Sequence, residues 1–152
     1  MTTTFPCPVD KTFQFTTPIQ SAPVGCYQVP VPGEIDRDGL AITKLGARGW
    51  GRLHHFRNYY NAGWGEGQGK PVSPKAVEAF YQFLALIEFP ANIKPSIFLT
   101  DQGSLELCWE NESGNDIQLE FSSTGIEYYI ESNEQEGTLG LLEIAELPNR
   151  LR

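Results

Sequence analysis

Hydrophobic residues recur at every second position through several segments in the C-terminal part of the chain. The alternating segments are Ser96–Thr100, Leu105–Glu110, Ile117–Ser122 and Ile126–Ser132. This alternation is typical of β-strands that bury one face, and the Gly- and Asn-containing stretches between the segments suit hairpin turns. The pattern therefore predicts an antiparallel meander of about four strands, while residues 138–147 fit either a last strand or a short helix.

Further upstream, the hydrophobic period changes to that of a helix. Apolar residues at helical spacing are Val77, Phe80, Tyr81, Leu84 and Ile87. Ser73 suits the N-cap of this helix and Pro74 its first position, where a missing amide hydrogen is harmless, and Pro90 ends it. An earlier helix is predicted from about Trp50 to Tyr60, because its apolar side chains also share one face.

Proline dominates the first 35 residues, which hold six of the eleven prolines in the chain. Because proline lacks an amide hydrogen and disfavours helix in the residue before it, this segment is expected to be extended. Short strands are expected at most near residues 12–16 and 26–29, and Asp36 to Lys44 is expected to form a turn and a short strand.

These elements together predict one α+β domain spanning residues 1–152. The expected parts are an extended Pro-rich N-terminal arm at 1–45 with short strands, a helical pair at 50–90 and a β-meander at 96–147. Two helices would pack on an antiparallel meander of about four to five strands, and the arm would lie across it.

Charge is distributed unevenly along the chain. Residues 1–75 carry eight Lys or Arg and five Asp or Glu, whereas residues 76–152 carry three bases and fourteen acids. A formal net charge of −8 argues against direct binding to nucleic acid or to an anionic membrane. No apolar run approaches the ~20 residues of a membrane-spanning helix, and no secretory signal pattern is visible, so a cytoplasmic location is expected.

The three cysteines, Cys7, Cys26 and Cys108, are an odd number and form no C-x-x-C pair. A zinc site would require paired Cys and His at short spacing, so no metal is predicted. A disulfide between Cys7 and Cys26 is sterically conceivable, but free thiols are expected in the cytoplasm.

Alternation gives the predicted sheet two faces of different chemistry. The expected core face carries Leu105, Leu107, Trp109, Ile117, Leu119, Phe121, Ile126, Tyr128 and Ile130. The opposite face carries Glu106, Cys108, Glu110, Gln118, Glu120, Glu127, Tyr129 and Glu131. No Lys or Arg balances the five Glu, although like charges that face each other destabilise a sheet. The face is either a solvated surface or one that binds a basic partner, with Tyr129 as a central contact. A divalent metal site is a third and less favoured interpretation, because Glu at i and i+2 of a flat sheet converge poorly and no Asp-x-Asp loop is present.

Two other features raise the question of catalysis. The first is a glycine-rich loop that contains Gly63, Trp64, Gly65 and Gly67. A Walker motif here would need Gly at position 64 and Ser or Thr at position 71, so the loop is not a phosphate-binding loop. The second is His54-His55, whose side chains point about 100° apart on a helix and would chelate one ion poorly. Cys108 and His55 could meet in space, but no local motif supports them, and neither a catalytic residue nor a cofactor is predicted.

The loop and the residues after it resemble a pattern in a scattered group of small, uncharacterised bacterial proteins. Gly63-Trp64-Gly65-Glu66-Gly67 and Pro71-Val72-Ser73-Pro74-Lys75-Ala76 are similar to that group's G-W-D-G-x-G/A loop and P-x-S-x-x-A helix start. The group's later D-G turn, L-E-W strand and G-x-I-x-Y strand have counterparts at residues 101–103, 107–109 and 125–128. The resemblance covers roughly residues 53–132 and departs at Gly65, where the group usually has Asp.

This resemblance implies a compact α+β domain and no established activity. The group's setting near mobile and defence-related genes implies an antitoxin-like or inhibitor-like role. The leading hypothesis is accordingly a non-catalytic protein whose acidic face, with the C-terminal segment, binds a basic protein partner such as the nucleic-acid site of a nuclease. The alternatives are a small enzyme near the glycine-rich loop and His54-His55, and a structural subunit that dimerises through its sheet.

Overall fold

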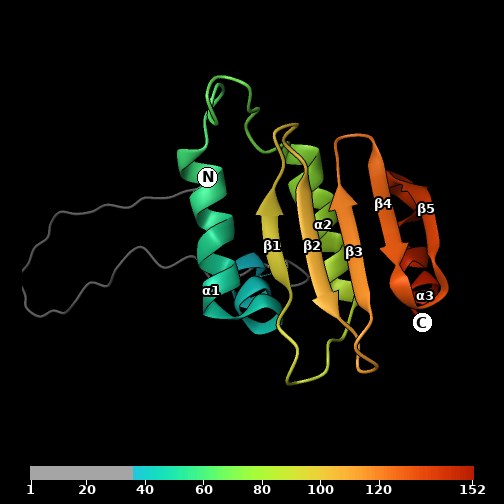
Figure 1. The fold of residues 1–152 in the computed structure, drawn as a ribbon. Helices are drawn as coiled ribbons and strands as arrows, with labels where there is room; N and C mark the ends of the chain where they lie inside the picture. Colours follow the sequence, from blue (N-terminus) through green and yellow to red (C-terminus); the bar gives the residue numbers. More distant parts are fainter. Residues whose placement is uncertain (1–35) are drawn as a thin grey trace, which may run out of the picture. The chain divides into compact units, whose positions relative to one another are not determined.

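The computed structural model describes residues 36–152, and the predictions made for residues 1–35, including the extended arm and the state of Cys7 and Cys26, lie outside this range. Within the described range the protein is an α+β fold. Its helices lie on one side of a five-stranded antiparallel sheet (Figure 1). None of the helices between residues 36 and 152 has the length and apolar character needed to cross a bilayer.

The sheet is a meander in which every strand pairs with its neighbour in sequence, in the order β1-β2-β3-β4-β5. The strands are β1 Ser96–Leu99, β2 Leu105–Glu110, β3 Asp116–Phe121, β4 Gly125–Ile130 and β5 Gln135–Gly140. The predicted meander is thus confirmed, with a fifth strand. Residues 138–147 contain both of the predicted alternatives, because β5 ends at Gly140 and is followed by the 3-10 helix η2, Leu141–Glu146, and by α3, Leu147–Arg150.

The prediction of a turn and a short strand at residues 36–44 was wrong, because helix α1 runs from Arg37 to Tyr59. Gly46 interrupts this helix with φ of 80° and ψ of 170°, a conformation that glycine adopts without a steric penalty. The part before the interruption is helical because Ala41 and Leu45, four residues apart, are both buried in the core. Residues 37–45 therefore belong to the folded domain rather than to an extended arm.

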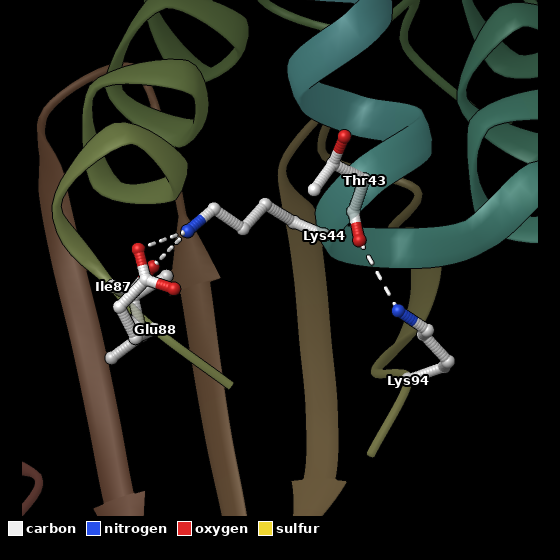
Figure 2. A network of polar contacts seen from close by, with 5 residues as sticks. All are labelled: Thr43, Lys44, Ile87, Glu88 and Lys94. Carbon is white, nitrogen blue, oxygen red and sulfur yellow. Dashed lines mark hydrogen bonds and ion pairs between the residues drawn. The ribbon is translucent and has the colours of Figure 1, made fainter. Parts of the chain in front are cut away.

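Two lysines fasten the bend in α1 to neighbouring segments (Figure 2). Lys44, whose side chain is only 10% exposed, donates a hydrogen bond to the backbone oxygen of Ile87 and pairs with Glu88 at 2.8 Å. Lys94, just before β1, donates to the backbone oxygen of Thr43 at 3.2 Å. Residues 43–44, just before the interruption at Gly46, therefore bond both to the residues that follow α2 and to the segment that precedes β1.

The second helix, α2, spans Pro74–Leu86 and confirms its prediction. The Ser73 hydroxyl accepts a hydrogen bond from the amide of Ala76, which satisfies one of the free donors in the first turn. Buried aromatic side chains of α2 contact the sheet, since Phe80 and Phe83 each lie 5.6 Å from the ring centre of Phe121.

The predicted core face of the sheet is also confirmed, with one exception. Trp109 is only partly buried, whereas the other eight predicted residues are buried in one continuous core with α1 and α2. Trp109 lies near the end of β2, where Phe89, from the segment after α2, packs edge-on against it at 5.0 Å. It keeps the register of the core face, because it is directly opposite the buried Ile117.

Candidate functional site

The face of the sheet that points away from the helices, called here the open face, aligns three glutamates across adjacent strands. Glu106 in β2 is directly opposite Glu120 in β3, and Glu120 is directly opposite Glu127 in β4. Neighbouring strands lie about 4.8 Å apart, so these three carboxylates, the glutamate row, form a closely spaced line of negative charge across the sheet. Glu127 is exposed and Glu120 is partly buried, which agrees with the predicted face for both.

Further carboxylates surround this row. Glu110 is opposite Asp116 at the end of the β2–β3 pair, and Tyr129 is opposite Glu136 in β5. Asp116 and Glu136 were not among the predicted site residues. Asp116 continues the alternation of β3 by one position and could have been found from the sequence. Glu136 could not, because the sequence left the start of β5 undecided.

Glu131 does not extend the alternation of β4 as predicted. The strand ends at Ile130, and Glu131 begins the 3-10 helix η1, Glu131–Asn133. Its carboxylate accepts a hydrogen bond from the amide of Asp116 at 2.9 Å. Glu131 therefore caps the β3 end of the face instead of presenting a free charge on it.

No cation neutralises the open face among the described residues. The strand positions on this face include no Lys, Arg or His. The ion pairs found within residues 36–152 are Arg37–Glu78, Lys44–Glu88, His54–Asp38 and Arg150–Glu146, all of which involve carboxylates outside the sheet. The glutamate row is therefore an uncompensated cluster of like charge.

Aromatic side chains and a shallow hollow accompany the charge. Tyr129 is 37% exposed and Phe98, which is opposite Glu106, is 41% exposed. A hollow of about 360 Å³ lies beside Tyr129 and is bordered by Glu120, Glu127 and Glu136. Exposed aromatic rings and charged groups at the rim of a depression are features of protein-binding surfaces.

Cys108, also on the open face, is not an activated nucleophile. Burial, together with smaller effects of the carboxylates of Glu106 and Asp116, raises the pKa of its thiol to about 11. At neutral pH the thiol is therefore protonated, and the thiolate that nucleophilic catalysis requires is scarce. The structure shows no contact between Cys108 and His55, which lies on α1.

The glycine-rich loop is a self-contained structural element. The amides of Gly63, Trp64, Gly67 and Gly69 all donate to backbone oxygens inside the loop. The indole of Trp64 donates to the oxygen of Lys70 at 2.6 Å and lies so close to Gly69 that a side chain there would overlap its ring. Because these amides are already used, they cannot surround a phosphate, and the loop serves to join α1 to α2.

The two histidines face different neighbours, as their adjacent helical positions require. His54 approaches Asp38 at 3.4 Å, and the indole of Trp50 donates to the same carboxylate at 3.1 Å. The Trp50 hydrogen bond is the main cause that lowers the pKa of Asp38, against a smaller opposing effect of burial, and His54 adds to the lowering. His55 instead stacks near Tyr59 and Tyr60. Residues 36–152 contain no cluster of His, Cys, Asp and Glu able to hold a metal ion.

Comparison of the chain with known protein families, with curated proteins and with solved structures finds no match. The resemblance to small bacterial proteins therefore remains a prediction. The geometry of the open face is the observation on which a functional proposal has to rest.

Proposed function

We propose that this protein is a non-catalytic binding protein whose open face docks on a basic surface of a protein partner. The observation that carries the proposal is the glutamate row, in which three carboxylates lie in register on three adjacent strands and none forms an ion pair within the described residues. Tyr129 and Phe98 add exposed aromatic surface to the same face.

The energetics of the row support a role in binding. Each pair of like charges directly opposite in a sheet costs stability, by about 0.2–1 kcal/mol on the scale of cross-strand pairs. A Lys or Arg in any of these positions would remove that cost. A basic partner would do the same on binding, so the repulsion in the free protein would become attraction in the complex.

The spacing of the row is close to that of a nucleic-acid backbone. Carboxylates on adjacent strands provide about one negative charge per 4.8 Å, compared with one per ~3.4 Å along each strand of DNA. The open face therefore suits a protein surface that has evolved to bind phosphates, such as that of a nuclease. An antitoxin, an immunity protein or a defence-system inhibitor would act in this way, by mimicking the charge of nucleic acid.

The alternative functions have less support. The enzyme hypothesis needs convergent groups near the glycine-rich loop, but the loop amides are internally bonded and His54 and His55 face different neighbours. Dimerisation through the open face would place one glutamate row against another, which is electrostatically unfavourable.

The test is capture from a lysate of the native host by the wild-type protein and by two charge-reversed variants. Glu120→Lys with Glu127→Lys reverses two members of the row. Glu112→Lys with Glu143→Lys makes the same change in net charge at exposed positions in the β2–β3 turn and in η2. A partner bound by the wild type and the control, but not by the row variant, is then purified for titration at low and moderate salt.

We expect the row variant to bind the purified partner more weakly and with less salt dependence, mainly through slower association. The control should keep most of the wild-type affinity. If both variants bind like the wild type at both salt concentrations, the open face is a solvated surface and the proposal is wrong.

A further inference from the structure

The described part of this acidic protein also contains a basic groove, between α1 and the edge strand β1. It has a volume of about 420 Å³. The lining residues that matter here are Arg48, Gly49, Arg52, Lys94, Ile97 and Phe98. Three of these six carry positive charge, whereas Gly49 is buried, and a Cβ at this position would lie 2.6 Å from the Cβ of Leu45. The groove shares Phe98 with the open face, because Phe98 is opposite Glu106, but none of the carboxylates on β2, β3 and β4 lines it.

Arg52 is held in a fixed orientation at the edge of the sheet. Its Nε donates to the backbone oxygen of Ile97 at 2.9 Å, and its guanidinium carbon lies 5.0 Å from the ring centre of Phe98. A ring of the core, Phe56, lies 5.4 Å away. Guanidinium has five N–H donors, and only the Nε donor has a partner within residues 36–152. Four donors on a rigid planar group therefore remain available to an anion.

The other two cations are similarly available. Lys94 donates one hydrogen bond, to the backbone oxygen of Thr43, which leaves two ammonium donors. Arg48 is exposed and is one helical turn from Arg52, an arrangement of like charges that costs an isolated helix some stability. No carboxylate in residues 36–152 forms an ion pair with any of the three, whereas Arg37, Lys44 and Arg150 each have an acidic partner.

We propose that this groove binds an organic anion, a carboxylate or phosphate group carried on an apolar body. The anion would accept hydrogen bonds from Arg52 with Arg48 and Lys94 as supporting charges, and the body would lie against the exposed ring of Phe98. The volume falls in the range of about 300–1,000 Å³ that is usual for small-molecule sites. The ligand is either a free small molecule or an acidic side chain or terminus of another polypeptide. This inference uses none of the open-face carboxylates and stands if the proposed function fails.

The experiment is a titration of the full-length, isotope-labelled protein monitored by the amide resonances of Gly49, Ile97 and Phe98. Phenyl phosphate, inorganic phosphate and an acetylated phenylalanyl-glutamate dipeptide are the probes. We expect saturable shifts at these amides with phenyl phosphate or the peptide, and weaker binding of inorganic phosphate, which has no apolar body. Tighter binding of phenyl phosphate would identify a free small molecule as the source of the anion, and tighter binding of the peptide would identify a polypeptide.

Two variants make the same change in charge at different places. Arg48→Glu should weaken binding of the tighter probe about tenfold or more, because a charge-assisted contact is lost and a repulsive charge is gained. Lys75→Glu, at an exposed site in the first turn of α2, should change it less than about twofold, since exposed charges far from the groove are screened. If Arg48→Glu unfolds the protein, Arg48→Gln, which preserves helix propensity, replaces it in the test and should also weaken binding of the probe.

The proposal is wrong if neither phenyl phosphate nor the peptide gives saturable shifts at the groove amides. It is also wrong if Lys75→Glu weakens binding as much as the Arg48 variants do, because the probes would then respond only to the overall charge. Equal affinity for phenyl phosphate and inorganic phosphate would mean that the apolar body contributes nothing to binding, and the proposed ligand class would be wrong.

Discussion

Reversing the charge of the central carboxylate in the glutamate row should stabilise the protein. Glu120 is opposite Glu106 on one side and Glu127 on the other, so Glu120→Lys converts two like-charge pairs into two opposite-charge pairs. The side chain is only partly exposed, on a face that no helix of the described residues covers, and Lys has the length to keep its ammonium in solvent.

The expected gain follows from the number of pairs. An exposed cross-strand pair contributes about 0.2–1 kcal/mol, and reversing one charge both removes a repulsion and adds an attraction. Two pairs therefore give roughly 1–4 kcal/mol in the free energy of unfolding. Glu106→Lys and Glu127→Lys each convert only one such pair within the row, and each should give about half of this gain.

Urea denaturation at low and high salt measures the effect. Glu112→Lys, in the exposed turn between β2 and β3, makes the same change in net charge without a carboxylate directly opposite and serves as the control. The advantage of Glu120→Lys over this control should shrink as salt rises, since screening shortens the Debye length from about 10 Å at 0.1 M to about 3 Å at 1 M. Equal stability of Glu120→Lys and Glu112→Lys at low salt would refute the local repulsion on which this prediction rests.

Two further predictions concern the core and the thiol. Replacing Leu84, which is fully buried in α2, by Ala should lower the free energy of unfolding by about 2–5 kcal/mol. A urea midpoint equal to that of the wild type would mean that α2 does not complete the core. The rate at which iodoacetamide alkylates Cys108 can be followed by mass spectrometry of the Cys108 peptide. This rate should rise with pH with a midpoint at about 11 in the folded protein and at ~8.5 in the unfolded chain. Since the folded state favours the neutral thiol, its contribution to stability is present below the unfolded pKa and is lost as pH rises towards 11. Equal pH profiles in the two states would contradict the burial of this thiol.

The periodic segments were predictable because each one carries its structural information locally. In β2, β3 and β4 alternation separates apolar from polar side chains, and burial of one set forces the other set outward whatever covers the core. Helix α2 was equally clear, with Ser73 and Pro74 at its start and apolar residues on one face. The acidic character of the open face was visible for the same reason.

The sequence by itself thus determined the meander, the second helix, and which face of the sheet is apolar and which is acidic. Only the tertiary structure decided which carboxylates are opposite each other, because strand register depends on how the hairpins close. Burial of Ala41 and Leu45 in the core also made residues 37–45 helical despite their turn-like sequence. The fold likewise brought Arg52 to the edge strand β1, where its Nε donates to the backbone oxygen of Ile97. The basic groove depends on Arg48 and Lys94, which are far apart in sequence, so no local pattern could have shown that they share one surface.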